Sequence, residues 1–227
     1  HFTFLFVFHM MSIMERKNPL GLIKAFRRAF RTDEKATLIL KTSFGARLPA
    51  LSRELQEAAA EAGITLIDQV FTQDETLSLI DAADAYVSLH RSEGLGLTMA
   101  EAMLLGKPVI ATGYSGNMDF MDESNSLLVD YKLVRLTREI PPYEAYCRWA
   151  EPDIDHAARL MRRIYENRDW ARDLGTKARA DARTLLSLDT AGQRMAHRLA
   201  DIQSARANRS QPTGAARPAG RALSTTL

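Results

Sequence analysis

The chain has 227 residues, of which 46% are hydrophobic and 26% are charged, and its formal net charge is +2. This composition excludes a disordered or fibrous chain and provides enough apolar material for a packed core. Residues 204–227 contain four arginines and no acid, so the rest of the chain carries a charge of −2. The basic charge is therefore partly a property of the C-terminal stretch, and we predict no nucleic-acid partner.

A single cysteine, Cys147, excludes an internal disulfide and is typical of a reducing compartment, so we expect a cytoplasmic protein. The apolar segment Phe2–Phe8 is shorter than the roughly 18 residues of a membrane-spanning helix, and it lacks the charged start of a signal peptide. It is better explained as a buried strand. Because the chain opens without methionine and directly in that strand, we expect it to be a piece of a longer protein.

Short apolar runs alternate with helical patterns over the first 129 residues. The predicted strands are Phe2–Phe8, Thr37–Lys41, Thr65–Asp68, Ala85–Leu89, Pro108–Ala111 and Ser126–Val129. The predicted helices are Pro19–Phe30, Pro49–Ala62, Gln73–Ala82 and Leu97–Leu105, with Asn18 as a start signal and Gly63 and Gly106 as stop signals. Apolar strands with intervening helices predict an α/β, Rossmann-like parallel sheet with helices on both faces.

The pattern changes after Val129. Residues 130–152 combine Pro141 and Pro142 with aromatic side chains, and we predict an irregular crossing segment there. Three C-terminal helices are then predicted, over Ile154–Asn167, Asp169–Ala182 and Leu188–Gln203. Residues 204–227 are rich in Ala, Arg, Ser, Pro and Gly and predict a disordered basic tail, so the folded domain is expected to be 1–203.

The segment from Ser92 to Met103 is the most informative motif, because two glutamates, Glu93 and Glu101, flank a glycine loop that leads into a helix. A glycine loop and a helix N-terminus can hold a diphosphate through backbone N–H groups. A carboxylate can accept hydrogen bonds from two neighbouring sugar hydroxyls. The motif therefore indicates a nucleotide-sugar site, although the spacing alone is equally explained by a strand–helix turn with a solvated Glu101.

Two consecutive stretches, EGLGLTMAEAM and GKPVIATGYSGNMDFM, resemble the donor-site signature of retaining GT-B glycosyltransferases of family 4. The upstream ERKNPL stretch resembles the first loop and helix of that family's donor-binding domain. The later WAEPD stretch is similar to a subset that builds polysaccharides from mannose- or rhamnose-type donors. The resemblance runs from Phe2 to Ile202 and implies the C-terminal, donor-binding half of a GT-B fold.

Carried over by position, the resemblance implies that Glu101 binds the ribose and that Glu93 contacts the transferred sugar. Lys17 would neutralise the diphosphate, with Arg16 beside it, so Glu93 and Lys17 are the candidate catalytic residues. Many family members have a further arginine before that lysine, and this chain has none there. The remaining residues of the loop and helix start are expected to meet the sugar and diphosphate; they are Gly94, Leu95, Gly96, Leu97 and Thr98.

Four further residues are candidates for the donor site, each with an ordinary structural explanation beside the functional one. Lys41 follows a strand and is either directed into the cleft or solvated. Phe71 lies where the family holds the nucleobase, or belongs to the core. His90 precedes the motif and is interpreted as a support behind the site, and Asn117 either lines the sugar pocket or caps a helix.

No metal and no other cofactor is predicted. Asp153 and Asp155 have the Asp-x-Asp spacing of a metal-binding motif from a different glycosyltransferase fold. A helix N-cap at Asp153 with a second acid in the first turn explains the same pattern without metal.

These inferences together predict hexosyl transfer with retention, from a nucleoside-diphosphate sugar to a glycan or lipid-linked acceptor in polysaccharide biosynthesis. The acceptor would bind to an N-terminal domain absent from this chain, so the fragment is expected to be inactive alone; membrane association through that missing half is left open. The alternatives are a non-catalytic nucleotide-sugar-binding module and a GT-B-like phosphorylase or epimerase. A dinucleotide-binding oxidoreductase is disfavoured, because no glycine fingerprint follows the first strand.

Overall fold

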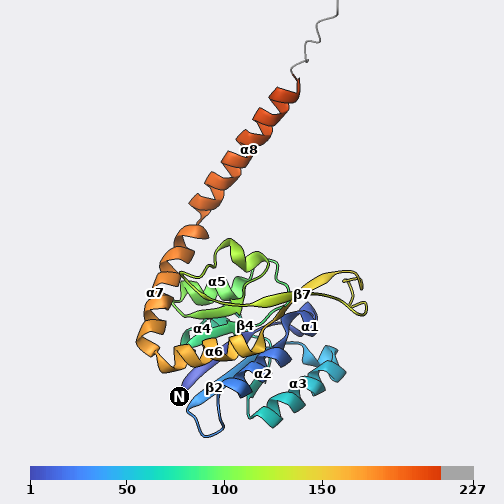
Figure 1. The fold of residues 1–227 in the computed structure, drawn as a ribbon, viewed down its shortest axis with the longest axis vertical. Helices are drawn as coiled ribbons and strands as arrows, with labels where there is room; N and C mark the ends of the chain where they lie inside the picture. Colours follow the sequence, from blue (N-terminus) through green and yellow to red (C-terminus); the bar gives the residue numbers. More distant parts are fainter. Residues whose placement is uncertain (211–227) are drawn as a thin grey trace, which may run out of the picture. The chain divides into compact units, whose positions relative to one another are not determined.

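A computed structural model describes residues 1–210 of the chain (Figure 1). The described residues divide into two units, His1–Leu186 and a second unit that begins at Ser187. The second unit contains helix α8, Leu188–Ser210. None of the helices described in the structure has the length and apolar run needed to cross a bilayer.

The first unit is built on a six-stranded sheet with the strand order β3-β2-β1-β4-β5-β6, and every neighbouring pair is parallel. Its strands are β1 (Phe2–Val7), β2 (Ala36–Thr42), β3 (Thr65–Asp68), β4 (Ala85–Ser88), β5 (Val109–Thr112) and β6 (Leu127–Val129). Each predicted strand is present, with its ends within one residue of the prediction. The strand order reverses direction between β1 and β4, which makes their carboxyl ends the topological switch point of the sheet.

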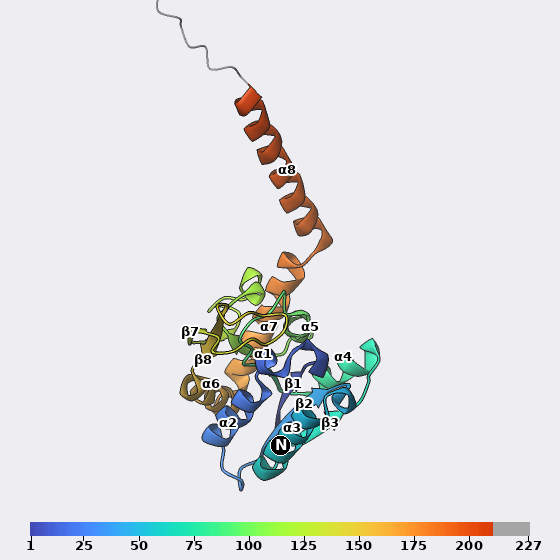
Figure 2. The ribbon, with the colours of Figure 1, turned by 90° about the vertical axis from the view of Figure 1, so that its right-hand side faces the viewer.

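Helices cover both faces of this sheet (Figure 2). Helix α2 packs against α3 and α6, whereas α5 packs against α4 and α7. The helices of the first unit are α1 (Met14–Lys17), α2 (Pro19–Ala29), α3 (Pro49–Ala62), α4 (Gln73–Ala82), α5 (Leu97–Leu104), α6 (Ile154–Glu166) and α7 (Arg168–Leu185). The predicted α/β, Rossmann-like fold with additional C-terminal helices is therefore confirmed.

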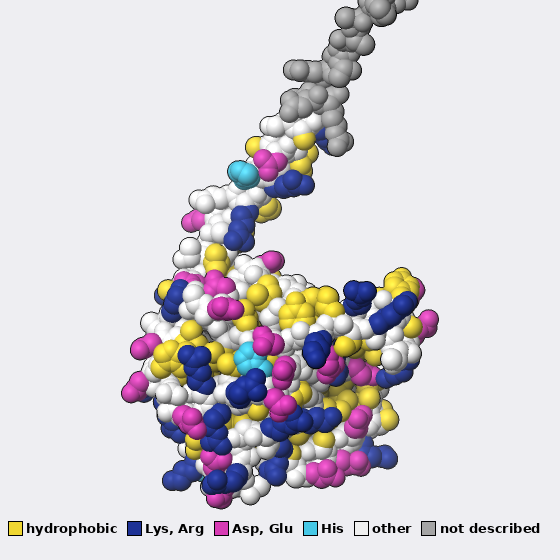
Figure 3. All heavy atoms as spheres, viewed as in Figure 1, with side chains coloured by type: hydrophobic (Ala, Val, Ile, Leu, Met, Phe, Trp, Pro, Cys, Tyr) yellow, Lys and Arg dark blue, Asp and Glu magenta, His cyan; other side chains and the backbone are white. Residues whose placement is uncertain are grey.

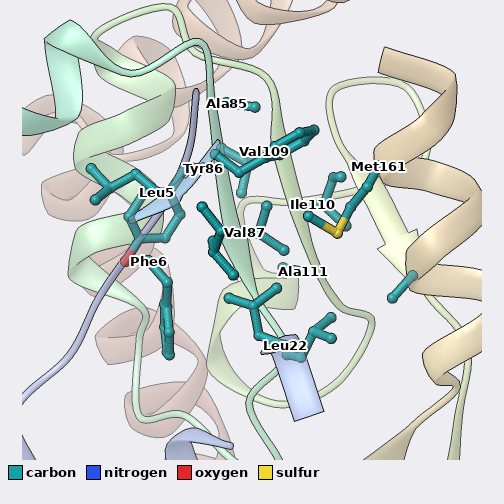
Figure 4. Close-up of a cluster of buried hydrophobic side chains, with 14 of the residues drawn as sticks. Leu5, Phe6, Leu22, Ala85, Tyr86, Val87, Val109, Ile110, Ala111 and Met161 are labelled. Atoms are coloured by element: carbon teal, nitrogen blue, oxygen red, sulfur yellow. The ribbon is translucent and has the colours of Figure 1, made fainter. Parts of the chain in front are cut away.

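The core lies on the central strands, whose side chains are buried on both faces of the sheet (Figure 4). Leu5, Val87 and Ile110 come from β1, β4 and β5 and are fully buried. Leu22 of α2 and Met161 of α6 are also fully buried in this core. Burial of each such side chain contributes roughly 1.5–3 kcal/mol, and the continuous apolar strands follow from this two-sided burial.

Local signals set the helix boundaries as the sequence predicts. Asn18 caps α2, with its side chain accepting a hydrogen bond from the Gly21 N–H, and Pro19 occupies the first helical position. Gly63 ends α3 in the left-handed conformation, with φ of 66°. The Asp153 side chain caps α6 by accepting a hydrogen bond from the His156 N–H at 2.9 Å.

The predicted irregular segment over residues 130–152 is wrong in part, because an antiparallel hairpin forms from β7 (Tyr131–Arg135) and β8 (Arg148–Pro152). Pro141 and Pro142 lie in the connection, where they remove no hydrogen bond from the β7–β8 ladder, and Pro152 ends β8 opposite Tyr131. Cross-strand pairs such as Val134 with Trp149 stabilise the two strands. The proline and aromatic content of the segment hid this pattern.

The predicted disordered tail is wrong for its first seven residues. Helix α8 continues through residues 204–210, where alanine and arginine favour helix. The rest of that predicted tail, residues 211–227, lies outside the described residues.

Candidate functional site

A cavity of about 510 Å³ opens at the carboxyl ends of the strands, beside the switch point between β1 and β4. Parallel α/β sheets bind ligands at this position. Eight of the thirteen predicted site residues line it: Lys17, Lys41, Phe71, Glu93, Leu95, Gly96, Leu97 and Thr98. The fold therefore brings together residues that are up to 81 positions apart in the chain.

The other five predicted residues do not line this cavity. They are Arg16, Gly94, Glu101, His90 and Asn117. His90 and Asn117 are fully buried, whereas Gly94 is exposed at the outer side of the loop.

An ion-pair cluster occupies the side of the cavity formed by α1 and the loop after β4. The Lys17 ammonium donates a hydrogen bond to Glu93 Oε2, and Arg16 Nη1 lies 3.8 Å from Glu93 Oε1. Burial of Glu93 favours its neutral form, but the charges of Lys17 and Arg16 more than offset this effect and hold its pKa below the usual range. Glu93 is therefore ionised at neutral pH, with two cations beside it.

The loop that carries Glu93 is fixed from behind by the segment after β5. The Glu93 N–H donates to Ser115 Oγ at 2.7 Å, and the Gly116 N–H donates to the Glu93 carbonyl at 3.3 Å. A Cβ on Gly116 would overlap the Gly94 carbonyl oxygen, so only glycine permits this approach. Ser115 itself has a positive φ of 74°, which is unusual for serine.

Helix α5 begins beside the cavity without a side-chain cap. Gly96 is its N-cap residue, with φ of 91°, and it has no side chain to accept hydrogen bonds from the first turn. The N–H groups of Leu97 and Thr98 at this end are therefore available to an anion. The positive end of the helix dipole adds to this preference.

A tyrosine hydroxyl fills the gap where β1 and β4 separate. Tyr86 Oη accepts from the Val7 N–H at 3.2 Å and lies 3.1 Å from the Val7 carbonyl. It also lies 2.7 Å from Thr98 Oγ1, so the first turn of α5 is connected to the end of β1. Burial raises the pKa of Tyr86, so the phenol remains protonated and can donate.

Glu101 lies one turn into α5, on the side of α4. Gln73 Nε2 donates a hydrogen bond to Glu101 Oε1 at 3.0 Å. Partial burial raises the pKa of Glu101, and the Gln73 hydrogen bond opposes this shift.

Lys41 is directed into the cavity rather than solvated. Its side chain is buried, its Nζ donates to the Gln69 carbonyl at 2.7 Å, and it lies 4.5 Å from the centre of the Phe71 ring. Burial lowers the pKa of Lys41, while Asp68 and Glu75 oppose the shift. Phe71 lines the cavity on this side. A solvated lysine and a purely core phenylalanine therefore do not describe these two residues.

His90 and Asn117 support the site from below. His90 Nε2 lies 3.1 Å from both the Tyr114 carbonyl and Asn117 Oδ1, and Asn117 Nδ2 donates to the Thr112 carbonyl. Because both partners of Nε2 are acceptors, this nitrogen carries the proton and Nδ1 accepts from Ser88 Oγ. Burial lowers the pKa of His90, so the ring is neutral.

Several contacts of the site have no signal in the sequence. Ser115, Gln73 and Tyr86 act through contacts with residues far away in the chain, which no spacing rule reveals. The cavity is also lined by residues that the sequence analysis did not single out, among them His9, Ser12, Phe44, Val70 and Thr76.

Over the described residues, no group of three or more His, Cys, Asp or Glu side chains is arranged to hold a metal ion. Asp153 is engaged as the cap of α6, and Asp155 forms an ion pair with Arg28. The predicted N-cap role of Asp153 is therefore confirmed.

Comparison with known proteins identifies relatives at the level of family and fold. The model of the family described as "Glycosyl transferases group 1" matches residues 1–139. No curated protein sequence matches the chain.

Among solved structures, HepE of Anabaena in complex with UDP and glucose is 20% identical, with a TM-score of 0.63 over 88% of this chain and 48% of that chain. Sucrose-phosphate synthase of Thermosynechococcus elongatus is 22% identical, with a TM-score of 0.66 over 90% of this chain and 46% of that chain. The catalytic domain of cholesterol-alpha-glucosyltransferase from Helicobacter pylori is 16% identical, with a TM-score of 0.55 over 80% and 96%. The chain spans about half the length of the first two structures. At these identities the likeness shows the fold, which is one half of a GT-B fold.

Proposed function

Since the chain belongs to the group 1 glycosyltransferases, we propose that its cavity binds a nucleoside-diphosphate sugar as the donor for glycosyl transfer. The observation that carries the proposal is the meeting of three groups in one cavity. The Lys17 ammonium and the uncapped start of α5 offer positive charge to a diphosphate, and Glu93 lies beside them for sugar hydroxyls. Structures with the same fold contain UDP with glucose or UDP-glucose, which supports this ligand class.

The nucleotide would extend from the ion-pair cluster towards α4. The base would lie against Phe71 and Lys41, and Glu101 would accept hydrogen bonds from the ribose hydroxyls. Gln73 already donates to Glu101 and would orient that carboxylate. Arg16 would act through Glu93 rather than by direct contact, because its guanidinium is directed at the loop.

The chemical step would depend on stabilising the leaving diphosphate. When the glycosidic bond breaks, negative charge grows on the diphosphate, and Lys17 with the N–H groups of α5 would stabilise that charge. Glu93 would hold the sugar in place. We propose retention of configuration and assign no nucleophilic side chain. The acceptor hydroxyl would then attack from the face that the diphosphate leaves and would pass its proton to an oxygen of the departing diphosphate.

The transferred group is proposed to be a hexose and the acceptor a glycan or a lipid-linked glycan, as in polysaccharide biosynthesis. We propose that the acceptor binds on a second domain, since this chain spans about half the length of the related structures. Without such a domain, the residues described here should bind donor without transferring sugar, and glycosyl transfer measured in its presence would eliminate a purely non-catalytic binding module.

A thermal-shift panel tests the proposal directly. UDP-glucose, GDP-mannose, ADP-glucose and dTDP-rhamnose are compared with free glucose and with the corresponding nucleosides. At about 100 times its Kd, the matching donor should add roughly 2.7 kcal/mol to the free energy of unfolding. This corresponds to a rise in Tm of about 5–10 °C for a domain of this size. If no nucleotide sugar raises the Tm of folded protein, the proposal is wrong.

Donor affinity is expected to fall at acidic pH because of Glu101. Its ionised carboxylate accepts ribose hydroxyls, and burial raises its pKa. Affinity should therefore be complete above this raised pKa and should fall as the pH drops through it, starting above the usual glutamate value of about 4.3. Calorimetric titration with the matching donor across this pH range measures the profile.

The Glu101→Gln variant should bind more weakly than the wild type and should lose this part of the pH dependence. Asp74→Asn, which changes an exposed carboxylate on the neighbouring α4, serves as the matched control and should keep the wild-type profile. Identical profiles for wild type and Glu101→Gln would contradict the assignment of Glu101.

A further inference from the structure

Helix α1 cannot hold its own position, although it carries Lys17. It has only four residues, and an isolated helix of this length is unstable in water. Both of its ends have left-handed backbone angles: φ is 67° at Ile13 and 56° at Asn18. For a β-branched residue such as Ile13 this conformation is strained and needs support from the surroundings.

Arg91 supplies that support through its backbone and its side chain. The Arg91 N–H donates to the Arg16 carbonyl at 2.8 Å, and Arg91 Nη1 donates to the Glu15 carbonyl at 2.6 Å. Two carbonyls of α1 are thus bound by one residue, which lies two positions before Glu93. A further hydrogen bond links α1 to the loop in the opposite direction, since Arg16 Nη1 donates to the Ser92 carbonyl at 2.8 Å.

Glu151 of strand β8 fixes the Arg91 guanidinium in turn. Arg91 Nε donates to Glu151 Oε2 at 2.6 Å, and Nη2 donates to Glu151 Oε1 at 3.0 Å, which is a bidentate pair. The Ala150 N–H also donates to the Arg91 carbonyl at 2.9 Å. The hairpin is therefore bound to the same residue that holds α1.

We propose that Arg91 and Glu151 are positioning residues, which set the separation between the Lys17 ammonium and the Glu93 carboxylate. The inference rests on the proposed donor site, because it assigns a role in binding to that separation. Lys17 is the last residue of α1, and Glu93 lies in the loop two positions after Arg91. The Arg91 guanidinium therefore connects the helix that carries Lys17 to the loop that carries Glu93. Without it, α1 loses the hydrogen bond at the Glu15 carbonyl and its link to Glu151, while the Arg91 N–H and the Arg16 guanidinium still hold it to the loop. The separation is then less well fixed, and the diphosphate and sugar have weaker simultaneous contact with Lys17 and Glu93.

The pair Arg162–Glu34 offers a matched control far from the site. It is also bidentate, at 2.6 and 2.9 Å, and Arg162 also donates to a backbone carbonyl, that of Ala29. None of these residues lines the proposed donor cavity. The variants Arg91→Lys and Arg162→Lys therefore remove similar interactions in two places.

The test compares two probes by calorimetry, the nucleotide sugar selected by the thermal-shift panel and its nucleoside monophosphate. The monophosphate lacks the sugar and the second phosphate, which are assigned to Glu93 and Lys17. Arg91→Lys is expected to lower the affinity for the nucleotide sugar about tenfold and the affinity for the monophosphate less than about twofold. Arg162→Lys should change neither affinity, whatever it does to Tm.

Glu151→Gln is a milder second variant, because the amide keeps one acceptor for the guanidinium. It should lower the affinity for the nucleotide sugar about threefold. If Arg91→Lys does not fold, this variant tests the positioning role in its place. The double variant should bind no more weakly than Arg91→Lys alone, since both changes break one unit.

Equal weakening of both probes by Arg91→Lys would reveal a general structural role and overturn the proposal, as would unchanged affinity for the nucleotide sugar. Failure of the wild type to bind any nucleotide sugar would instead overturn the proposed function itself, so the two failures are distinguishable.

Discussion

Lys17→Met is expected to weaken nucleotide-sugar binding by about 30- to 150-fold, or about 2–3 kcal/mol. The ammonium is the cation closest to Glu93 in the cavity, and it is assigned to the diphosphate. Its removal also leaves the Glu93 carboxylate with only the more distant Arg16 as a counter-charge, so the carboxylate should repel the ligand. Calorimetry with the matching donor measures the loss, and the dependence of affinity on salt should become weaker.

Two further variants sharpen this prediction. Lys24→Met removes an exposed lysine of α2 and should leave donor affinity unchanged. Adding Glu93→Gln to Lys17→Met should raise the affinity for the sugar-free nucleoside diphosphate, because the repelling carboxylate is gone. If the double variant binds the diphosphate as weakly as Lys17→Met, the loss does not arise from the charge balance of this ion pair.

Gly116→Ala is expected to lower the free energy of unfolding by about 3 kcal/mol and to abolish donor binding. The added Cβ would overlap the Gly94 carbonyl, which is backbone and cannot rotate away. The loop of Glu93 must then move, and its hydrogen bonds with Ser115 and Gly116 are lost. Thermal unfolding should show a fall in Tm of about 6–12 °C.

Gly94→Ala is the matched control for stability, since an added Cβ there meets nothing within 4 Å. It should change the free energy of unfolding by less than about 0.5 kcal/mol. Equal Tm values for the two alanine variants would show that the close approach of Gly116 to Gly94 does not constrain the fold.

Most of the fold follows from local patterns in the sequence. The strands are continuous apolar runs that must be buried on both faces, and signals such as Asn18–Pro19 and Gly63 mark the helix ends. The hairpin β7–β8 has a weak local signal, because both strands are short, β7 is fully exposed while β8 is mostly buried, and the pairing spans a long connection. Composition does not reveal where α8 ends, because residues 204–210 lack large apolar side chains although their alanine and arginine favour helix.

The site is predictable only where one motif carries it. Glu93, Gly96 and Thr98 lie within one stretch, so their neighbourhood is visible in the sequence. Arg91 acts across the fold, and nothing in its local sequence distinguishes it from a solvated residue. Ser115 lies within the second signature-like stretch, but its hydrogen bond with the Glu93 backbone is visible only in the fold. His90 and Asn117 were predicted near the site, but the amide of Asn117 binds the imidazole rather than lining the cavity.

Charged side chains of both signs are interspersed on the face shown in Figure 3. This face therefore offers no broad basic surface to a doubly charged ligand. At the cavity itself, Lys17 and Lys41 supply positive charge, and the ion pair of Lys17 with Glu93 places a cation and an anion side by side.

The separation of β1 from β4 has a mechanical consequence. These strands pair through only two residue couples, Phe4 with Ala85 and Leu5 with Tyr86, whereas β1 and β2 pair through six. Beyond them, the Val7 backbone relies on the Tyr86 hydroxyl. A donor bound to Lys17 on one side and to Glu93 and α5 on the other would hold the ends of β1 and β4 together. Donor binding should therefore slow amide hydrogen exchange at Val7, whose N–H is bound to the Tyr86 hydroxyl.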